Sequence, residues 1–420
     1  MIREIEQCRL CEGELFSNRL VLSPTPLANE LYDTSQEAEK AEVFPLTLAM
    51  CSMCSHVQLV YLVSSKRLFE NYAYQSGTSS FFRKHFEEFA SSTSQFVSNA
   101  PVLEIGSNDG TLLAAYQKLG IRNVGIEPSA QLVHGCLELG LDARVGYFDE
   151  KTRKALIVEF GLFDLIVANN VLAHIDDLRQ VFFDIYNSLS NEGVCVFEVA
   201  HLLKMVEQGT FDSIYHEHMS YHSLFSLNKF CTSVGLRIFK VEQVDSHGGS
   251  IRVFVSKNPK VEVQSSVQNL INSEIDAGLD QPEILKVIEG QINHLKGEIE
   301  EIFFSDLENL NKFTFGYGAP AKLVTFISET QLYTVDLRFV VDDNPLKQGK
   351  FVPKWSIPIV SHIEAQQEIS RLLKQFPGLR IRVVIFPWNL SEEIIDKLTE
   401  WLPDGTEVVW FNKGVNVREI

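Results

Sequence analysis

Residues 102–113 read VLEIGSNDGTLL and set the fold of the middle of the chain. A short, mainly apolar segment comes first, a turn with Gly106 and Gly110 follows, and the residues from Thr111 onward have helical spacing. Glycine in such a turn lets the backbone approach a ligand, and the start of a helix presents unpaired N–H groups. We therefore expect a strand, a ligand-binding turn and a helix, in that order.

The flanking sequence alternates between short apolar segments and amphipathic ones. We expect strands at 101–105, 123–126, 162–168, 194–199, 236–244 and 248–255, and helices at 79–96, 111–119 and 130–139. Such alternation is typical of a parallel, doubly wound sheet. The predicted fold class is therefore α/β, with a Rossmann-like middle domain.

A second alternation follows a charged, helix-periodic stretch at 267–310. Here we expect strands at 313–317, 337–341, 381–386 and 408–411, and helices at 321–327 and 392–401. The predicted parts are a cysteine-bearing unit at 1–65, a Rossmann-like domain at 66–260, a helical connection at 261–312 and a second Rossmann-like α/β domain at 313–420.

The acidic residues of the first glycine turn indicate its cofactor. The third glycine of a dinucleotide fingerprint is missing, and Glu104 and Asp109 suit a pyrophosphate badly. They suit S-adenosylmethionine (SAM), which is cationic at its sulfonium and its amino group. Glu127 ends the next strand, where an acidic residue accepts both ribose hydroxyls in such folds. A class I methyltransferase is indicated, with predicted SAM contacts at Glu104, Gly106, Ser107, Asn108, Asp109, Gly110, Glu127, Pro128 and Asn169.

Four of the seven cysteines form two pairs, CRLC at 8–11 and CSMC at 51–54. Two residues between thiolates let one turn direct both sulfurs at one ion, and two such turns complete a tetrahedral shell around Zn²⁺. We therefore expect a zinc ion rather than unliganded thiols. A closed shell leaves no position for substrate, so the zinc ion would be structural. His56 is then structural or incidental, and the predicted ligands are Cys8, Cys11, Cys51 and Cys54.

The segment YHEHMSYHS at 215–223 holds three of the eleven histidines. Groups that titrate near neutrality suit proton abstraction and stabilisation of an anion; the alternative is a solvated loop. No HExxH motif occurs, so a catalytic zinc is weakly supported. His174 follows a predicted strand and either reaches the same cleft or has a packing role. The cluster DSHGGSIR at 245–252 is either a phosphate or sugar cradle or a tight hairpin turn.

Composition limits the class of protein. With 420 residues, 45% hydrophobic and 22% charged, the chain suits a folded protein of about two to three domains. A net charge of -18 disfavours nucleic acid and anionic membranes as partners. No run reaches the roughly 18 to 20 apolar residues of a membrane span, and the start lacks a signal-peptide pattern, so we expect a cytoplasmic protein, monomeric or a small homo-oligomer, with a small-molecule substrate.

Six motifs in this order resemble the three-domain C-methyltransferases of branched deoxysugar pathways. They are the CxxC motif, which occurs twice and is counted once, YAYQSGTS at 72–79, EIGSNDGTLL at 104–113, YHEHMSYHS, SHGGSIR at 246–252 and GYGAPAK at 316–322. The resemblance implies a zinc-binding N-terminal domain, a SAM-binding middle domain and a C-terminal domain that helps to hold a sugar nucleotide. It also implies deprotonation at carbon 3 of a nucleotide-linked 4-keto-deoxyhexose, followed by methylation of the enolate.

The same resemblance implies roles for individual residues. His218 would be the general base, with Tyr215, Glu217 and His174 around the keto sugar. Either Tyr72 or Tyr74 would close over it, and the motif does not decide between them. The predicted substrate contacts are His216, Tyr221, His222, His247, Gly248, Arg252 and Lys322.

Two other functions compete with this interpretation. An NAD-dependent sugar-nucleotide oxidoreductase or epimerase would need a G-x-G-x-x-G fingerprint, which neither glycine turn shows; in GYGAPAK, Pro320 disrupts the spacing. A zinc-bearing scaffold without enzymatic activity would bind no SAM.

Overall fold

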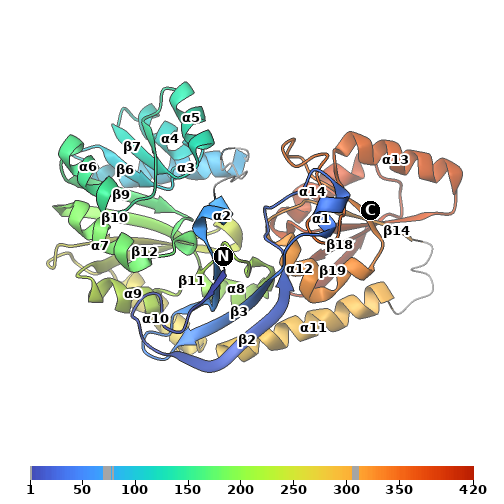
Figure 1. Ribbon diagram of the computed structural model, residues 1–420, viewed down its shortest axis with the longest axis horizontal. Helices are drawn as coiled ribbons and strands as arrows, with labels where there is room; N and C mark the ends of the chain where they lie inside the picture. Colours follow the sequence, from blue (N-terminus) through green and yellow to red (C-terminus); the bar gives the residue numbers. More distant parts are fainter. Residues whose placement is uncertain (1, 70–76, 78–79, 305–311) are drawn as a thin grey trace.

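The computed structural model describes residues 2–69, 77, 80–304 and 312–420. Two α/β lobes lie at opposite ends of the molecule, and the N-terminal unit lies between them (Figure 1). A long helix, α11 (Ile284–Phe304), extends beneath this unit toward the C-terminal lobe (Figure 1). In the described ranges, no helix combines the length and apolar character needed to cross a bilayer.

The middle lobe is built on a seven-stranded sheet whose order, β12-β13-β10-β9-β6-β7-β8, confirms the predicted Rossmann-like fold. Only β13 runs antiparallel to its neighbours in this sheet. Because β6 pairs with β7 on one side and β9 on the other, the carboxyl ends of β6 and β9 form the crevice where ligands of such sheets bind. The strands are β6 (Val102–Ile105), β7 (Asn123–Glu127), β8 (Ala143–Val145), β9 (Phe163–Asn169), β10 (Leu189–Ala200), β12 (Arg237–Val244) and β13 (Ser250–Ser256).

Helices bury apolar side chains against both faces of this sheet. Phe89 and Tyr116 belong to one buried cluster, and Phe182 and Phe230 belong to the cluster on the other face. The helices of the lobe are α3 (Ser80–Thr93), α4 (Thr111–Lys118), α5 (Ala130–Glu138), α6 (Glu150–Phe160), α7 (Leu178–Ser188), α8 (Leu202–Gln208) and α9 (Leu224–Ser233).

The N-terminal unit is a four-stranded antiparallel sheet of order β11-β4-β3-β2. Its fourth strand, β11 (Ser220–Tyr221), belongs to the histidine-rich segment rather than to the N-terminal sequence. The predicted zinc unit and the predicted active-site segment therefore share one sheet. The other elements are β1 (Ile2–Glu4), β2 (Leu15–Thr25), β3 (Phe44–Cys51), β4 (Val57–Leu59), β5 (Tyr61–Val63), α1 (Ser35–Glu39) and α2 (Ser65–Phe69).

The C-terminal lobe has a six-stranded sheet of order β16-β15-β14-β17-β18-β19, parallel except for β19, which confirms a second Rossmann-like domain. Its switch point lies at the carboxyl ends of β14 and β17. Helix α13 is not among the helices expected from the sequence, and it buries only Ala365 and Ile369. The elements are β14 (Lys312–Tyr317), α12 (Leu323–Thr330), β15 (Leu337–Val341), β16 (Ile359–Val360), α13 (His362–Gln375), β17 (Arg380–Ile385), α14 (Ser391–Thr399), β18 (Glu407–Phe411) and β19 (Val415–Glu419).

One buried core joins the N-terminal unit to the C-terminal lobe. Leu46 of β3, Ile292 of α11 and Ile327 of α12 belong to the same cluster. A second helix, α10 (Ser265–Asp276), packs on β12 and α9 of the middle lobe. The predicted divisions at residues 65 and 312 stay predictions, and the shared core crosses both positions.

Candidate functional site

The four paired cysteines converge on one point. Their sulfur atoms all lie within 4.8 Å of one another. Cys8 Sγ is 3.6 Å from Cys54 Sγ, and Cys11 Sγ is 3.4 Å from Cys51 Sγ, so none is in a disulfide. Four convergent thiol groups fit a tetrahedral Zn²⁺ ion and close its coordination shell. The zinc centre is therefore structural.

This centre is attached to the middle lobe. Leu10, between the cysteines of the first pair, belongs to the same buried cluster as Phe197 of β10. Arg179 Nη1 donates to the carbonyl oxygen of Leu10 (3.3 Å), and Lys229 Nζ donates to that of Met53 (3.3 Å). Both cysteine turns are thus held by residues of the middle lobe.

The glycine turn after β6 has the conformation that the sequence predicts for a ligand-binding turn. Gly106 has φ 72°, and a Cβ atom there would lie 2.7 Å from Val171 Cγ2. Gly110 has φ 77° and is the N-cap of α4. A side chain at Gly106 would be strained and would clash, so the bare backbone borders the crevice at this point.

Unpaired polar atoms lie at the carboxyl ends of β6 and β9. In the part of the chain that the structure describes, Glu104 Oε2 and both amide atoms of Asn169 are buried without hydrogen-bond partners. Burial, followed by the charges of Asp109 and Glu127, holds the pKa of Glu104 well above its usual range. Glu104 Oε2 and Asn169 Oδ1 can accept from a ligand that is rich in donors, and a cationic ligand would favour the ionised form of Glu104, so the residues present fit SAM.

Glu127 is held toward this turn. Its Oε2 accepts from the backbone N–H of Asn108 (3.1 Å), and its Oε1 accepts from that of Ser129 (2.9 Å). Asp109 instead accepts from Thr111 Oγ1 (2.6 Å) and from the backbone N–H of Gly77 (2.7 Å). Asp109 thus joins the turn to Gly77. The individual SAM contacts, including Ser107 and Pro128, stay predictions.

We expect Glu127→Ala to weaken SAM binding by about 1 to 3 kcal/mol, the range for lost hydrogen bonds to a charged group. Calorimetric titration with SAM measures the effect. Glu138→Ala is a matched control, because this glutamate lies in the following helix with an exposed side chain. An unchanged affinity of Glu127→Ala would show that the ribose is bound elsewhere.

His218 is oriented by its own segment. Its Nδ1 lies 2.8 Å from the carbonyl oxygen of Ser213, which can only accept a hydrogen bond, so Nδ1 carries the proton. Nε2 is then the basic nitrogen and accepts from the hydroxyl of Tyr215 (2.9 Å). A neutral imidazole in this tautomer can receive a proton at Nε2 without changing its Nδ1 contact.

Two other predicted residues lie near this imidazole. The ring of His174 is 5.1 Å from that of His218, centroid to centroid, and packs edge-on against it. Glu217 is buried, and its Oε1 accepts from Asn29 Nδ2 (2.6 Å). The structure therefore brings His174, His218 and Tyr215 together, whereas Glu217 contacts the N-terminal unit. Tyr72 and Tyr74 lie outside the described residues.

The C-terminal lobe holds the residues just before the histidine-rich segment. Trp388 Nε1 donates to Asp212 Oδ2 (3.0 Å), and Thr325 Oγ1 donates to the carbonyl oxygen of Ile214 (2.7 Å). Sequence reasoning missed Asn29, Thr325 and Trp388. Only Trp388 has a sequence signal, because it follows the predicted strand 381–386 at its carboxyl end.

The remaining residues of the histidine-rich segment contact the N-terminal unit. His216 Nε2 lies 3.3 Å from the carbonyl oxygen of Pro45, and burial lowers the pKa of His216 to about 4. The ring of His222 lies 5.6 Å from that of His56, and burial lowers its pKa to about 3. Tyr221 is buried in β11, and burial raises its pKa. Their roles in substrate binding stay predictions.

The SHGGSIR motif is the tight turn of the β12–β13 hairpin, and it contacts the C-terminal lobe. A Cβ atom at Gly248, with φ 85°, would lie 2.4 Å from Trp388 Cη2, so glycine permits this contact. Lys322 Nζ lies 3.8 Å from the centre of the Trp388 ring and 3.7 Å from Asp212 Oδ2. Two predicted substrate residues, Gly248 and Lys322, thus meet at Trp388. The side chain of His247 lies outside the described part.

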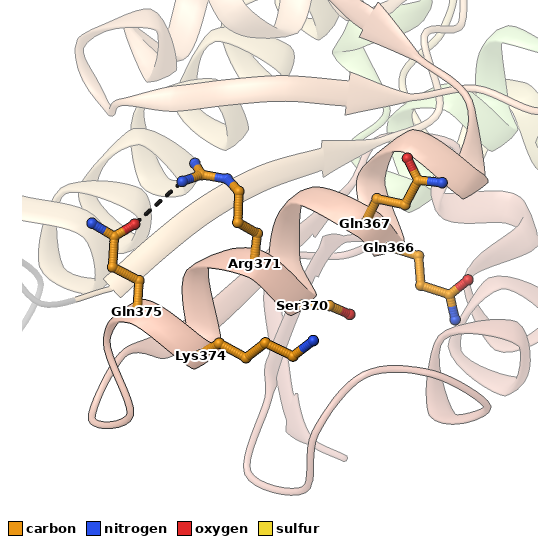
Figure 2. Close-up of a pocket in the computed structure, with 6 residues that line it drawn as sticks. All are labelled: Gln366, Gln367, Ser370, Arg371, Lys374 and Gln375. Atoms are coloured by element: carbon orange, nitrogen blue, oxygen red, sulfur yellow. Dashed lines mark hydrogen bonds between the residues drawn. The ribbon is translucent and has the colours of Figure 1, made fainter.

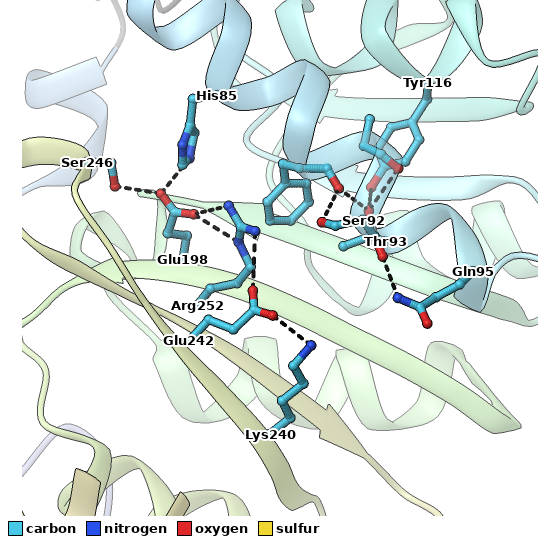
Figure 3. A network of polar contacts seen from close by, with 12 residues as sticks. His85, Ser92, Thr93, Gln95, Tyr116, Glu198, Lys240, Glu242, Ser246 and Arg252 are labelled. Carbon is cyan, nitrogen blue, oxygen red and sulfur yellow. Dashed lines mark hydrogen bonds and ion pairs between the residues drawn. The ribbon is translucent and has the colours of Figure 1, made fainter. Parts of the chain in front are cut away.

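Arg252 makes an internal ion pair. Its Nε and Nη2 both lie 3.2 Å from Glu198 Oε2 (Figure 3). The other carboxylate oxygen, Oε1, contacts His85 Nε2 (2.8 Å) and Ser246 Oγ (2.7 Å) (Figure 3). Arg252 therefore joins β13 to β10, and its role in substrate binding stays a prediction.

A separate hollow lies on the outer face of α13 and holds none of the predicted site residues. Its lining comes from one helix, as Figure 2 shows: Gln366, Gln367, Ser370, Arg371, Lys374 and Gln375. These six side chains include no carboxylate or imidazole that could activate Ser370 or Lys374, so we assign no chemistry to it.

Comparison with known families covers the chain in three successive parts. Residues 8–69 match a model described as "Putative zinc binding domain", residues 74–241 match "Methyltransferase domain", and residues 245–411 match "C-methyltransferase C-terminal domain". The chain is thus similar, over nearly its whole length, to the three-domain C-methyltransferases. It is 28% identical to C-methyltransferase NovU of Streptomyces niveus over 409 residues, which is 96% of this chain and 95% of that protein.

Solved structures also resemble part of this C-methyltransferase. PH0226 protein from Pyrococcus horikoshii OT3 is 16% identical with a TM-score of 0.37, covering 46% of this chain and 97% of its own. The CcbJ methyltransferase from Streptomyces caelestis is 12% identical with a TM-score of 0.35, covering 46% and 95%.

Proposed function

We propose that this SAM-dependent C-methyltransferase acts on a nucleotide-linked 4-keto-deoxyhexose. It removes the proton from carbon 3 and methylates the resulting enolate, which gives a branched-chain sugar. The observation that carries the proposal is the oriented imidazole of His218, whose Nδ1 contacts the carbonyl oxygen of Ser213 and whose Nε2 contacts the hydroxyl of Tyr215. A base of this kind suits a carbon acid next to a ketone.

In this proposal His218 accepts the proton, and its neighbours Tyr215 and His174 donate hydrogen bonds to the enolate oxygen. A substrate C–H that approaches His218 Nε2 takes the place of the Tyr215 hydroxyl, which can then donate to the enolate oxygen. His174 lies beside the same imidazole and is a second donor for that oxygen. SAM, when bound, supplies the electrophilic methyl group. No step of this chemistry requires the zinc ion.

Lys322 supports the nucleotide part of the proposal. The protein carries a net charge of -18, so an anionic substrate needs a local cation. Lys322 follows β14 at the switch point of the C-terminal sheet, where ligands of open α/β sheets bind. Asp212 and Trp388 hold its ammonium group between the two lobes. We propose that it binds the diphosphate.

The affinity for the sugar nucleotide is expected to fall as the pH rises through about 8. Burial lowers the pKa of Lys322 to about 8, against the opposing effect of Asp212, so the ammonium is present below this pH and lost above it. KM for the sugar nucleotide should rise above pH 8, whereas KM for SAM should not. Lys322→Arg keeps the charge at high pH and should remove this rise. A rise of the same size in Lys322→Arg would assign the effect to another group.

Turnover with a panel of 4-keto sugar nucleotides tests the proposed function. Mass spectrometry should show a gain of one methyl group, and NMR should place it on carbon 3. Methylation of a panel member at an oxygen or nitrogen atom, or redox turnover with NAD in place of methyl transfer, would contradict the proposal.

A further inference from the structure

Arg9 reaches from the zinc-binding turn into the candidate active site. It lies between Cys8 and Cys11, and its Nη1 donates to Ser220 Oγ (2.6 Å). Its Nη2 donates to the carbonyl oxygens of Ile175 and Asp176, the latter at 2.7 Å. One guanidinium group therefore joins two loops that are far apart in the sequence.

These two loops carry the paired imidazoles. Ile175 directly follows His174, and Ser220 is two residues beyond His218. A second contact joins the same two loops: the backbone N–H of Met219, the residue after His218, donates to the carbonyl oxygen of Ala173, the residue before His174 (2.8 Å). These two contacts lie before and after His174 and directly after His218, and Arg9 provides the one that follows His174.

The turn that holds Arg9 is itself rigidly placed. The backbone N–H of Arg9 donates to Gln58 Oε1 (2.8 Å), and Gln58 Nε2 donates in turn to the carbonyl oxygen of Gln7 (3.2 Å). Zinc binding at Cys8 and Cys11 fixes the backbone on both sides of Arg9. The planar guanidinium then transmits this geometry, because its donors have a fixed fork arrangement.

The acceptors of Arg9 point to positioning rather than to stability alone. They are two carbonyl oxygens, one hydroxyl and the thioether sulfur of Met219 (3.8 Å), all neutral, and a partly buried cation gains less from neutral acceptors than from a carboxylate. Arg3 shows the contrast, since it pairs with the carboxylate of Asp176 at an exposed site.

We propose that Arg9 is a positioning residue that sets the spacing and orientation of His174 and His218. The zinc-binding turn thereby contributes to proton abstraction without touching the substrate. This inference rests on the proposed function only in taking His218 as the base.

Kinetics of Arg9→Met and Arg9→Lys, with Arg3→Met as the matched control, provide the first test. We expect kcat of Arg9→Met to fall by about 10 to 100-fold, since small misplacements of reacting groups have effects of this size. Zinc content, SAM affinity and KM should stay within about twofold of the native values. Deuterium at the reacting carbon should slow Arg9→Met more than the native enzyme, because proton abstraction becomes limiting. Arg9→Lys should recover part of the rate, and Arg3→Met should match the native enzyme.

Nitrogen-15 NMR of labelled histidine side chains gives a readout that does not depend on turnover. The His218 signals, assigned by their loss in His218→Asn, should shift in Arg9→Met and stay in place in Arg3→Met. If no sugar nucleotide is turned over but these signals shift, the proposed function fails and the positioning role stands. Native signals together with a native kcat in Arg9→Met would overturn the positioning role.

Ser220→Ala covers the case in which Arg9→Met fails to fold or loses zinc. It removes one acceptor of the guanidinium and leaves the cysteine turn intact. A smaller change of kcat and of the His218 signals, in the same direction, supports the proposal. Native values of both would contradict it.

Discussion

His218→Asn is expected to lower the rate of methyl transfer by about 10² to 10⁴-fold, the usual effect of removing a general base. Asparagine keeps a similar size and polarity, and its amide can still donate to the carbonyl oxygen of Ser213. It cannot accept a proton at neutral pH, so the variant removes the chemistry with little steric change. Methyl transfer is measured by mass spectrometry with SAM and a 4-keto sugar nucleotide.

Proton exchange separates the base from a substrate-binding role. In deuterated water without SAM, the native enzyme should exchange the proton on carbon 3, and His218→Asn should not. His134→Asn is the matched control, because its side chain is exposed on α5. Exchange at the native rate in His218→Asn would assign the base to another residue, with His174 or Tyr215 next. Loss of sugar-nucleotide binding in His218→Asn would instead show that His218 binds the substrate.

Cys51→Ser is expected to reduce the zinc content well below the one ion per chain that we predict for the native protein. Structural zinc contributes its binding free energy to folding, about 10 kcal/mol or more in small zinc domains. Because the cysteine turns also attach the N-terminal unit to the middle lobe, the melting temperature should fall by about 5 to 10 °C. Metal analysis and thermal unfolding measure the two effects.

Cys231→Ala is the matched control for this prediction. Cys231 is a buried cysteine of α9 outside the cluster, so its replacement should leave the zinc content unchanged. Full zinc content in Cys51→Ser would show that the four cysteines are not the ligand set. An unchanged melting temperature after metal loss would show that the zinc ion contributes little to the fold.

The parallel strands were predictable because their signals are local. The expected strand at 123–126 and helix at 111–119 agree with β7 and α4 to within one residue at each end. By contrast, β11 has only two residues and pairs with β4 across more than half of the middle domain's sequence. No local periodicity can predict such a pairing. For the turn at 245–249 the sequence allowed either a phosphate or sugar cradle or a tight hairpin turn. Neither interpretation predicted the contact of Gly248 with Trp388.

The sequence by itself predicted the two Rossmann-like domains, the two cysteine pairs that form one cluster, and the glycine turn after β6, because each of these signals is a local pattern. Only the tertiary structure decided which groups meet at His218. The carbonyl oxygen of Ser213 determines its tautomer, Thr325 contacts Ile214 from the C-terminal lobe, and Arg9 contacts Ser220 from the N-terminal unit. Such contacts depend on how sheets pack against one another, and hydrogen-bond donors such as these leave no periodic pattern in the sequence.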